Sequence, residues 1–159
     1  MDKNFKAINE PIIDFEPGSS HRALLKEEIL RQSERIKDIP IIIHGKEVRT
    51  GDTMPCTKPH DHQHVLGHYH QAGEKEIQMA IDSSLEAWKT WSKTSLDERA
   101  KIFKKVADLV AGKYRYKINA AAMLDIGKSV FQAEVDASCE LVDFLNFNIE
   151  FSYQMQNSF

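Results

Sequence analysis

The stretch from Ile126 to Asn148, with its continuation to Phe151, predicts one long helix whose apolar surface must be buried against another surface. On a 3.6-residue period its apolar side chains form two adjacent stripes, and polar side chains occupy the opposite arc. The first stripe contains Val130, Ala133, Ala137, Leu141, Phe144 and Phe151, and the second contains Phe131, Val135, Val142, Leu145 and Ile149. The polar arc contains Gln132, Asp136, Asp143, Asn146 and Glu150.

Two acids of this helix fall outside its polar arc. Glu134 projects into the apolar side, in the second turn, where the helix dipole and a neighbouring cation can satisfy a carboxylate. We therefore expect a structural ion pair for Glu134 rather than a functional acid. Glu140 falls at the border, where a carboxylate can be half buried and still reach a ligand. From spacing alone, a surface ion pair is the expected role of Glu140.

Composition limits the class of protein. The chain has 159 residues, of which 42% are hydrophobic and 28% charged, as expected for one globular domain or part of one. Its net charge of −3 provides no basic field for a nucleic acid or an anionic membrane surface. We find no signal-peptide core and no membrane-spanning run, so we expect a soluble, unexported chain. Two cysteines, Cys56 and Cys139, are too few for a disulfide framework and fit a reducing compartment.

The amino-terminal half predicts an arm, a helix and a small β segment. Pro17 and Gly18 end the arm, and Ser19 or Ser20 caps a helix to about Lys37. The buried side of this helix is predicted to contain Leu25, Ile29 and Ile36. Residues 39–43 and 46–50 form a β-hairpin around a His44-Gly45 turn. Pro55 and Pro59 predict a loop, and residues 62–70 a further strand.

The carboxy-terminal half predicts four helices. The first runs from Gly73 to about Ser92, and its stripe of Ile77, Ile81, Ser84, Trp88 and Trp91 presents both tryptophans to a core. The second begins at a capping box formed by Ser95 and Glu98, and ends at Gly112. One side of it is predicted to carry Ile102, Phe103, Val106, Leu109 and Val110. The third covers about 114–125 and ends at Gly127, and the long helix begins near Ser129.

Three patterns suggest chemistry, and each has a simpler structural explanation. Five histidines lie within residues 60–70 and could bind zinc or copper, but without a ligand motif at metal spacing we favour a solvated hairpin. Gly127, Lys128 and Ser129 match the end of a phosphate-binding loop, but Ala122 replaces its first glycine, so we favour a helix break. Cys139 lies in mid-helix with no nearby histidine, which predicts a packing or surface thiol. Spacing alone therefore gives no catalytic group and no metal site.

Four segments of the chain resemble the amino-terminal third of the Δ1-pyrroline-5-carboxylate dehydrogenases, a branch of the aldehyde dehydrogenase superfamily. They are NEPIIDFEPGS, IPIIIHGKEVRTGD, AIDSSLEAWKTWSKTSLDERAKIFKKVADLVAG and MLDIGKSVFQAEVDASCELVDFLNFNIEFS. Arg99 and the Gly127-Lys128 turn are general to the superfamily. The segment QAEVDASCELVDFLNFN, which includes Glu140, is specific to the branch.

This resemblance implies an oxidoreductase that converts L-glutamate γ-semialdehyde to L-glutamate with NAD, in proline degradation. It also implies a homo-oligomer that acts on a small molecule. The absence of an Arg-rich presequence favours a cytoplasmic location, with the mitochondrial matrix as the alternative if a transit segment is missing. A cysteine nucleophile and a glutamate base perform the family's chemistry, and both lie beyond Phe159, as do the NAD-binding residues. We therefore expect a fragment that is inactive alone and contains no catalytic, cofactor-binding or metal-binding residue. One substrate contact transfers: Glu140 matches the glutamate that lies near the α-ammonium group of the substrate.

The fold implied by the resemblance is part of an α/β protein. It predicts four to five helices and a small antiparallel β segment. Residues 1–159 are then an incomplete amino-terminal portion of the NAD-binding domain. We divide this portion into an arm and helix (1–38), a β-hairpin segment (39–72) and a helical segment (73–159). Helices that cover a missing sheet should leave their apolar stripes exposed. Two alternatives remain open, a non-catalytic helical module that binds partners and a metal-binding protein that uses the histidine segment.

Overall fold

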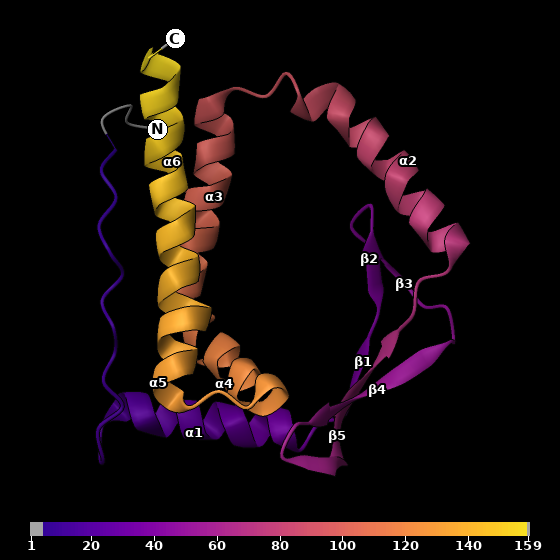
Figure 1. The fold of residues 1–159 in the computed structure, drawn as a ribbon, viewed down its shortest axis with the longest axis vertical. Coiled ribbons are helices and arrows are strands. Elements are labelled where there is room, and N and C mark those ends of the chain that lie inside the picture. The colour runs from indigo at the N-terminus through magenta and orange to yellow at the C-terminus, as the bar shows by residue number, and fades with distance from the viewer. Residues whose placement is uncertain (1–4, 159) are drawn as a thin grey trace. The chain divides into compact units, whose positions relative to one another are not determined.

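The computed structural model describes residues 5–158. They form two units, one from residues 5–32 and 95–158 and the other from residues 33–94. The first unit consists of the arm and of helices packed side by side, and the second of short strands followed by one helix (Figure 1). Within the described residues, we find no helix with the length and apolar character that crossing a membrane requires.

The helical unit is built around one long column. Its elements are α1 (Ser20–Ser33), α3 (Leu96–Ala111), α4 (Arg115–Ile126), α5 (Val130–Gln132), the π-helix η1 (Ala133–Cys139) and α6 (Glu140–Ser158). The last three follow one another without a break, α3 packs along α6, and the extended arm runs along the other side of α6 (Figure 1). Three small clusters form the core: Phe15 with Leu25 and Ala120, Ala100 with Ile149 and Tyr153, and Ala107 with Val110 and Val142.

The helix ends of this unit follow from local chemistry. Ser95 and Glu98 form the predicted capping box of α3, and Gly112 ends that helix. Gly127 closes α4 in the left-handed conformation, with a φ of 68°, which a residue without a Cβ adopts easily. Ser129 then caps the next helix by accepting a hydrogen bond from the Gln132 N–H. The predicted helix break at 127–129 is therefore confirmed.

The second unit contains two small sheets and α2 (Glu74–Trp91). Its strands are β1 (Lys37–Ile39), β2 (Ile41–Ile43), β3 (Lys46–Val48), β4 (Thr53–Lys58) and β5 (Asp61–His70). The predicted hairpin is confirmed as the antiparallel β2–β3 pair, whose two turn residues both have positive φ, 52° at His44 and 69° at Gly45. The other sheet has the order β1-β5-β4, and β1 pairs with β5 in parallel. The β segment is therefore mixed rather than purely antiparallel.

Three local predictions for the amino-terminal half are wrong. Helix α1 ends at Ser33 rather than near Lys37, so Ile36 lies outside the helix and is 61% exposed. Ile39 belongs to β1, because Pro40 separates it from β2. Pro55 lies inside β4 rather than in a loop, which is possible because β4 is an edge strand of its sheet, where a missing N–H leaves no ladder partner unsatisfied.

One predicted helix face is wrong and a second is only partly right. Trp88 and Trp91 of α2 are 65% and 40% exposed, and no residue of α2 is buried, because the described residues do not cover this stripe. In α3 the buried residues are Ala100, Ala107 and Val110, of which only Val110 was predicted, whereas Phe103 is 46% exposed. Exposure of apolar stripes is what we expect of helices that cover a surface outside the described chain.

The two predicted stripes of the long helix have different outcomes. After Ala133 the first stripe is not buried, and its Leu141, Phe144 and Phe151 are at least 39% exposed. Of the second stripe, Val142 and Ile149 are buried, and the other buried positions are Glu134, Ser138, Cys139, Glu150 and Tyr153. The cause is the π-helix η1, in which the Glu140 N–H donates to the Val135 carbonyl five residues back instead of four. One extra residue per turn rotates every later side chain relative to an uninterrupted α-helix.

Candidate functional site

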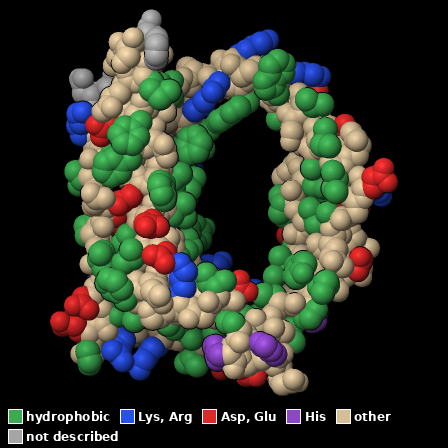
Figure 2. All heavy atoms as spheres, in the orientation of Figure 1, with side chains coloured by type: hydrophobic (Ala, Val, Ile, Leu, Met, Phe, Trp, Pro, Cys, Tyr) green, Lys and Arg blue, Asp and Glu red, His purple; other side chains and the backbone are tan. Residues whose placement is uncertain are grey.

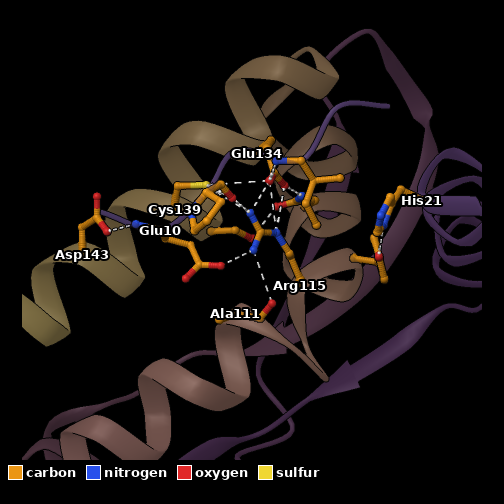
Figure 3. Close-up of polar contacts among 12 residues, drawn as sticks. Glu10, His21, Ala111, Arg115, Glu134, Cys139 and Asp143 are labelled. Atoms are coloured by element: carbon orange, nitrogen blue, oxygen red, sulfur yellow. Dashed lines mark hydrogen bonds and ion pairs between the residues drawn. The ribbon is translucent and has the colours of Figure 1, made fainter. Parts of the chain in front are cut away.

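The buried side of η1 is organised around Glu134, which is completely buried (Figure 3). Arg115, from the first turn of α4, donates to both carboxylate oxygens of Glu134 through Nε and adds a short hydrogen bond through Nη2. The Asn119 side chain and the Ile13 backbone N–H each donate to Glu134 over 2.7 Å. The predicted structural ion pair of Glu134 is therefore confirmed, and its cation is Arg115.

The same guanidinium ties the arm to the helices. Arg115 Nη1 donates to Glu10 over 2.5 Å, and Nη2 donates to the Pro11 carbonyl over 2.7 Å. Burial opposes ionisation of Glu134, but the hydrogen bonds from Arg115, Ile13 and Asn119 outweigh it and hold the pKa of Glu134 below its ordinary value. The ion pair is thus a charged, fully hydrogen-bonded group inside the helical unit, and its loss would leave a buried charge unpaired.

Cys139 lies on this buried side, in surroundings that disfavour its thiolate form. Its thiol is 4% exposed and lies 3.3 Å from Arg115 Nη2. Burial and the neighbouring Glu134 carboxylate raise the pKa of the Cys139 thiol to about 11. Because the thiolate is the reactive form of cysteine, this environment suppresses reactivity. The prediction of a packing thiol is confirmed.

The arm docks through a regular series of backbone hydrogen bonds. The N–H groups of Ala7, Glu10 and Ile13, three residues apart, donate to carboxylates on the helical column over 2.6 to 2.8 Å. The acceptors are Glu150, Asp143 and Glu134, in that order along the arm. Lys6 adds an ion pair to Glu150, and Asn9 adds a hydrogen bond to Asp143. Glu150, predicted to lie on a polar arc, is buried because the arm covers it.

Glu140 lies on the other side of the same column. Its side chain is exposed, rather than half buried as its position at the helical border predicted, because η1 has rotated the helix. It lines a shallow groove of about 400 Å³ with Asp143, Phe144, Phe147, Asn148 and Phe151. Figure 2 shows acidic side chains among hydrophobic ones along the column formed by α5, η1 and α6.

The Glu140 carboxylate has no partner within residues 5–158. No hydrogen bond or ion pair joins the Glu140 side chain to another described residue, so the surface ion pair expected from spacing alone is not formed. Asp143, in the same groove, already accepts hydrogen bonds from the arm. The free acid of this groove is therefore Glu140, and an apolar surface with one available carboxylate suits a ligand that carries a positive charge.

The histidine segment does not converge on a common point. In β5, His64 lies 2.8 Å from the Ser33 carbonyl, His62 lies 3.1 Å from the Pro59 carbonyl, and His70 lies 3.0 Å from Asp38. These three imidazoles thus each have a separate hydrogen-bond partner. Among residues 5–158, no group of three potential metal ligands is close enough to hold an ion. Of the three contacts, the one from His70 to Asp38 joins β5 to β1, and the one from His64 joins β5 to the last residue of α1.

The Gly127-Lys128-Ser129 turn has structural partners. Lys128 forms an ion pair with Asp136 over 2.6 Å, and Ser129 and Gln132 form a capping box.

Arg99 lies near the start of α3 and lines a second pocket of about 340 Å³, mostly with apolar residues of α3 and α6.

Sequence patterns could not reveal the docking of the arm, since its contacts join residues more than 100 positions apart.

Comparison with known proteins identifies the family of this chain. The sequence model described as "Aldehyde dehydrogenase family" matches residues 47–159, more than two thirds of the chain. The chain belongs to the aldehyde dehydrogenase family. This agrees with a mixed α/β fold dominated by helices, and it confirms the family resemblance found in the sequence.

Individual relatives give finer similarity within the family. The chain is 41% identical, over 94% of its length, to the mitochondrial delta-1-pyrroline-5-carboxylate dehydrogenase of Dictyostelium discoideum, and 34% identical over 96% to the human enzyme of that name. It spans 27% of the length of each relative. A crystal structure of the Mycobacterium tuberculosis delta-pyrroline-5-carboxylate dehydrogenase bound with NAD is 38% identical, with a TM-score of 0.90, over 94% of this chain and 28% of that one.

Proposed function

We propose that this chain is the amino-terminal part of an NAD-dependent dehydrogenase that oxidises L-glutamate γ-semialdehyde to L-glutamate in proline degradation. The observation that carries the proposal is the 41% identity, over 94% of the chain, to a relative named as a delta-1-pyrroline-5-carboxylate dehydrogenase. NAD is proposed as the hydride acceptor because the similar Mycobacterium tuberculosis enzyme has a structure bound with NAD. We propose that the catalytic cysteine and base belong to other parts of the enzyme, and for the cysteine this is supported by the burial that raises the pKa of the Cys139 thiol to about 11.

Glu140 is proposed as the group that binds the α-ammonium of the substrate. An exposed carboxylate beside Phe144 and Phe147, without a partner in the described chain, can accept a charge-assisted hydrogen bond from a primary ammonium group. An aldehyde without an amine gains nothing from this carboxylate. Glu140 therefore acts on substrate selectivity and not on the chemical step.

Steady-state kinetics of the intact enzyme test this role. Glu140→Gln keeps the size of the side chain and removes its charge, so we expect kcat/KM for glutamate semialdehyde to fall about 10- to 100-fold. For a simple aliphatic aldehyde the fall should be smaller than about threefold, because no charged hydrogen bond is lost. Asp136→Asn is the matched control, since Asp136 lies on the same helical column and pairs with Lys128. Equal losses for both substrates would reject the role.

The domain and assembly proposals follow from the same relationship. Residues 1–159 would belong to the NAD-binding domain, with the arm and helix (1–38), the hairpin segment (39–72) and the helical segment (73–159) as its parts. The intact enzyme would be a homo-oligomer. Its compartment would be the cytoplasm or the mitochondrial matrix, and the mitochondrial names of the Dictyostelium and human relatives favour the second.

The exposed apolar stripes agree better with this proposal than with a free partner-binding module. Leu141, Phe144 and Phe151 are exposed along one side of α6. In a larger enzyme these side chains would cover the rest of the same domain, which requires no second protein. Size-exclusion chromatography of the intact enzyme and of this chain distinguishes part of a larger enzyme from a free partner-binding module. We expect discrete oligomers for the enzyme and self-association for the chain alone.

A further inference from the structure

The η1 segment brings three polar or thiol side chains to one side of the helix. In an α-helix, residues five positions apart differ by about 140° around the axis, so Glu134 and Cys139 would point in different directions. In η1 the turn closes after five residues, and Glu134, Ser138 and Cys139 are all buried on one side. The π-turn is therefore what permits Arg115 to contact both Glu134 and Cys139.

The same turn decides which side chains of α6 face the groove. Glu140 is the first residue after η1, and the buried face continues through Val142, Ile149 and Tyr153. Without the extra residue, α6 would rotate by about 100° relative to α5. Leu141 and Phe144 would then lie on the buried side, as an uninterrupted period predicts. Cys139 would turn outward, and Glu140 would no longer lie where it does in the groove.

Buried donors from three directions stabilise the π-turn through one acid. Glu134 accepts hydrogen bonds from Arg115 and Asn119 on α4 and from the Ile13 N–H on the arm. Asn119 also accepts a hydrogen bond of 2.6 Å from Ser138, four residues after Glu134. Both ends of the π-turn are thus fixed to the same two side chains of α4. Such a network can offset the poorer hydrogen-bond geometry of a π-helix.

We propose that Glu134 is a positioning residue: by holding the π-turn of η1, it fixes the rotation of α6 and so keeps Glu140 in the substrate groove. The effect on selectivity rests on the proposed role of Glu140. The effect on helix rotation does not, because it concerns only which side chains are buried. Glu134 never contacts the substrate in this proposal, and it acts through the backbone of η1.

Cysteine labelling measures the rotation directly. In the intact enzyme carrying Phe144→Cys, iodoacetamide labelling of the two peptides that contain positions 139 and 144 is followed by mass spectrometry. We expect Glu134→Gln to increase labelling of Cys139 about tenfold and to decrease labelling at position 144, which is 64% exposed as phenylalanine. The opposite signs are diagnostic, because general loosening of the structure would increase labelling at both positions.

Glu150→Gln is the matched control. Glu150 is also a buried acid that accepts an arm N–H, but it lies on α6 eleven residues beyond the end of η1, so its loss should leave both labelling rates unchanged within about twofold. If Glu134→Gln does not fold, the charge-balanced pair Arg115→Gln with Glu134→Gln replaces it, with the same expected pattern. Increased labelling at both positions, or no change at either, would overturn the proposal.

Steady-state kinetics test whether the rotation of α6 changes substrate selectivity. We expect Glu134→Gln to raise KM for glutamate semialdehyde about tenfold, with a smaller change in kcat and a smaller KM change for a simple aldehyde. If Glu140→Gln changes selectivity and Glu134→Gln does not, the positioning role is wrong. If Glu140→Gln itself has no selective effect, the proposed function fails, and labelling alone then decides whether Glu134 fixes the rotation of α6.

Discussion

The acids on the two sides of the helical column from Val130 to Ser158 differ in their hydrogen-bond partners. On the buried side, Glu134 has donors from α4 and from the arm. On the exposed side, six residues later, Glu140 has no partner within the described chain. A satisfied acid holds structure, whereas an unsatisfied acid beside an apolar groove is available to a ligand. Position relative to the π-turn, and not residue type, separates the two roles.

The largest effect should come from the cation of the buried side. Arg115→Leu leaves the Glu134 carboxylate buried without its charge partner, which should lower the free energy of unfolding by about 3–5 kcal/mol. Urea denaturation followed by circular dichroism measures the loss. Arg31→Leu, which breaks an exposed ion pair with Glu28, should have a far smaller effect. Similar losses for the two variants would remove the contrast between buried and exposed acids.

A smaller effect should come from the arm. Ile13→Pro removes one of several hydrogen bonds to the buried Glu134 carboxylate, and a hydrogen bond to a charged group contributes about 1.5–3 kcal/mol to the free energy of unfolding. Ile12→Pro is the neighbouring control, because no hydrogen bond joins the Ile12 N–H to a described residue. The same urea titrations compare them. If Ile12→Pro lowers the free energy of unfolding as much as Ile13→Pro, the arm stabilises the fold by its packing and not by its hydrogen bond to Glu134.

The buried side should also make the free energy of unfolding depend on alkaline pH, through Cys139. The pKa of Cys139 is raised from 9.0 to about 11, so the folded state holds this proton more tightly than the unfolded state. Its contribution is complete below about pH 9 and is lost as the pH rises through about 11, by about 3 kcal/mol. Cys139→Ala should therefore show a weaker fall in unfolding free energy between those pH values than the unchanged protein. Parallel pH dependences would mean that the thiol is not held in a low-polarity, anionic environment.

The smallest effect is expected at the turn before the column. Lys128→Ala removes a surface ion pair with Asp136 and should change the unfolding free energy by less than about 1 kcal/mol. If the Gly127-Lys128-Ser129 turn bound phosphate, the same variant would weaken nucleotide binding by the intact enzyme. Isothermal titration with NAD should give the same affinity before and after the substitution.

Local chemistry made much of the fold predictable. The Ser95 and Ser129 caps, the Gly112 and Gly127 stops and the hairpin turn at His44-Gly45 depend on neighbouring residues, and all of them are confirmed. The edge strand containing Pro55 was missed, because local signals do not reveal which strands lie at an edge.

Long-range features account for the remaining errors. The 3.6-residue period assumes i to i+4 hydrogen bonds throughout, so it could not anticipate the π-turn, after which Val142 of the second predicted stripe is buried and Leu141 of the first is exposed. Burial of Glu150 depends on an arm 143 residues away in sequence. The ion pair of Glu134 was predicted as a type of contact, but the spacing gave no means of choosing Arg115. Trp88 is 65% exposed although it lies on a predicted apolar stripe, because periodicity does not show whether another part of the chain covers a stripe.

A crystal structure of the intact enzyme with bound L-glutamate tests the contrast between the two acids most directly. We expect the α-ammonium nitrogen of glutamate at hydrogen-bond distance, about 2.7–3.2 Å, from the Glu140 carboxylate. Glu134 should remain paired with Arg115 on the other side of the column. A ligand ammonium bound elsewhere, with Glu140 in open solvent, would contradict the account.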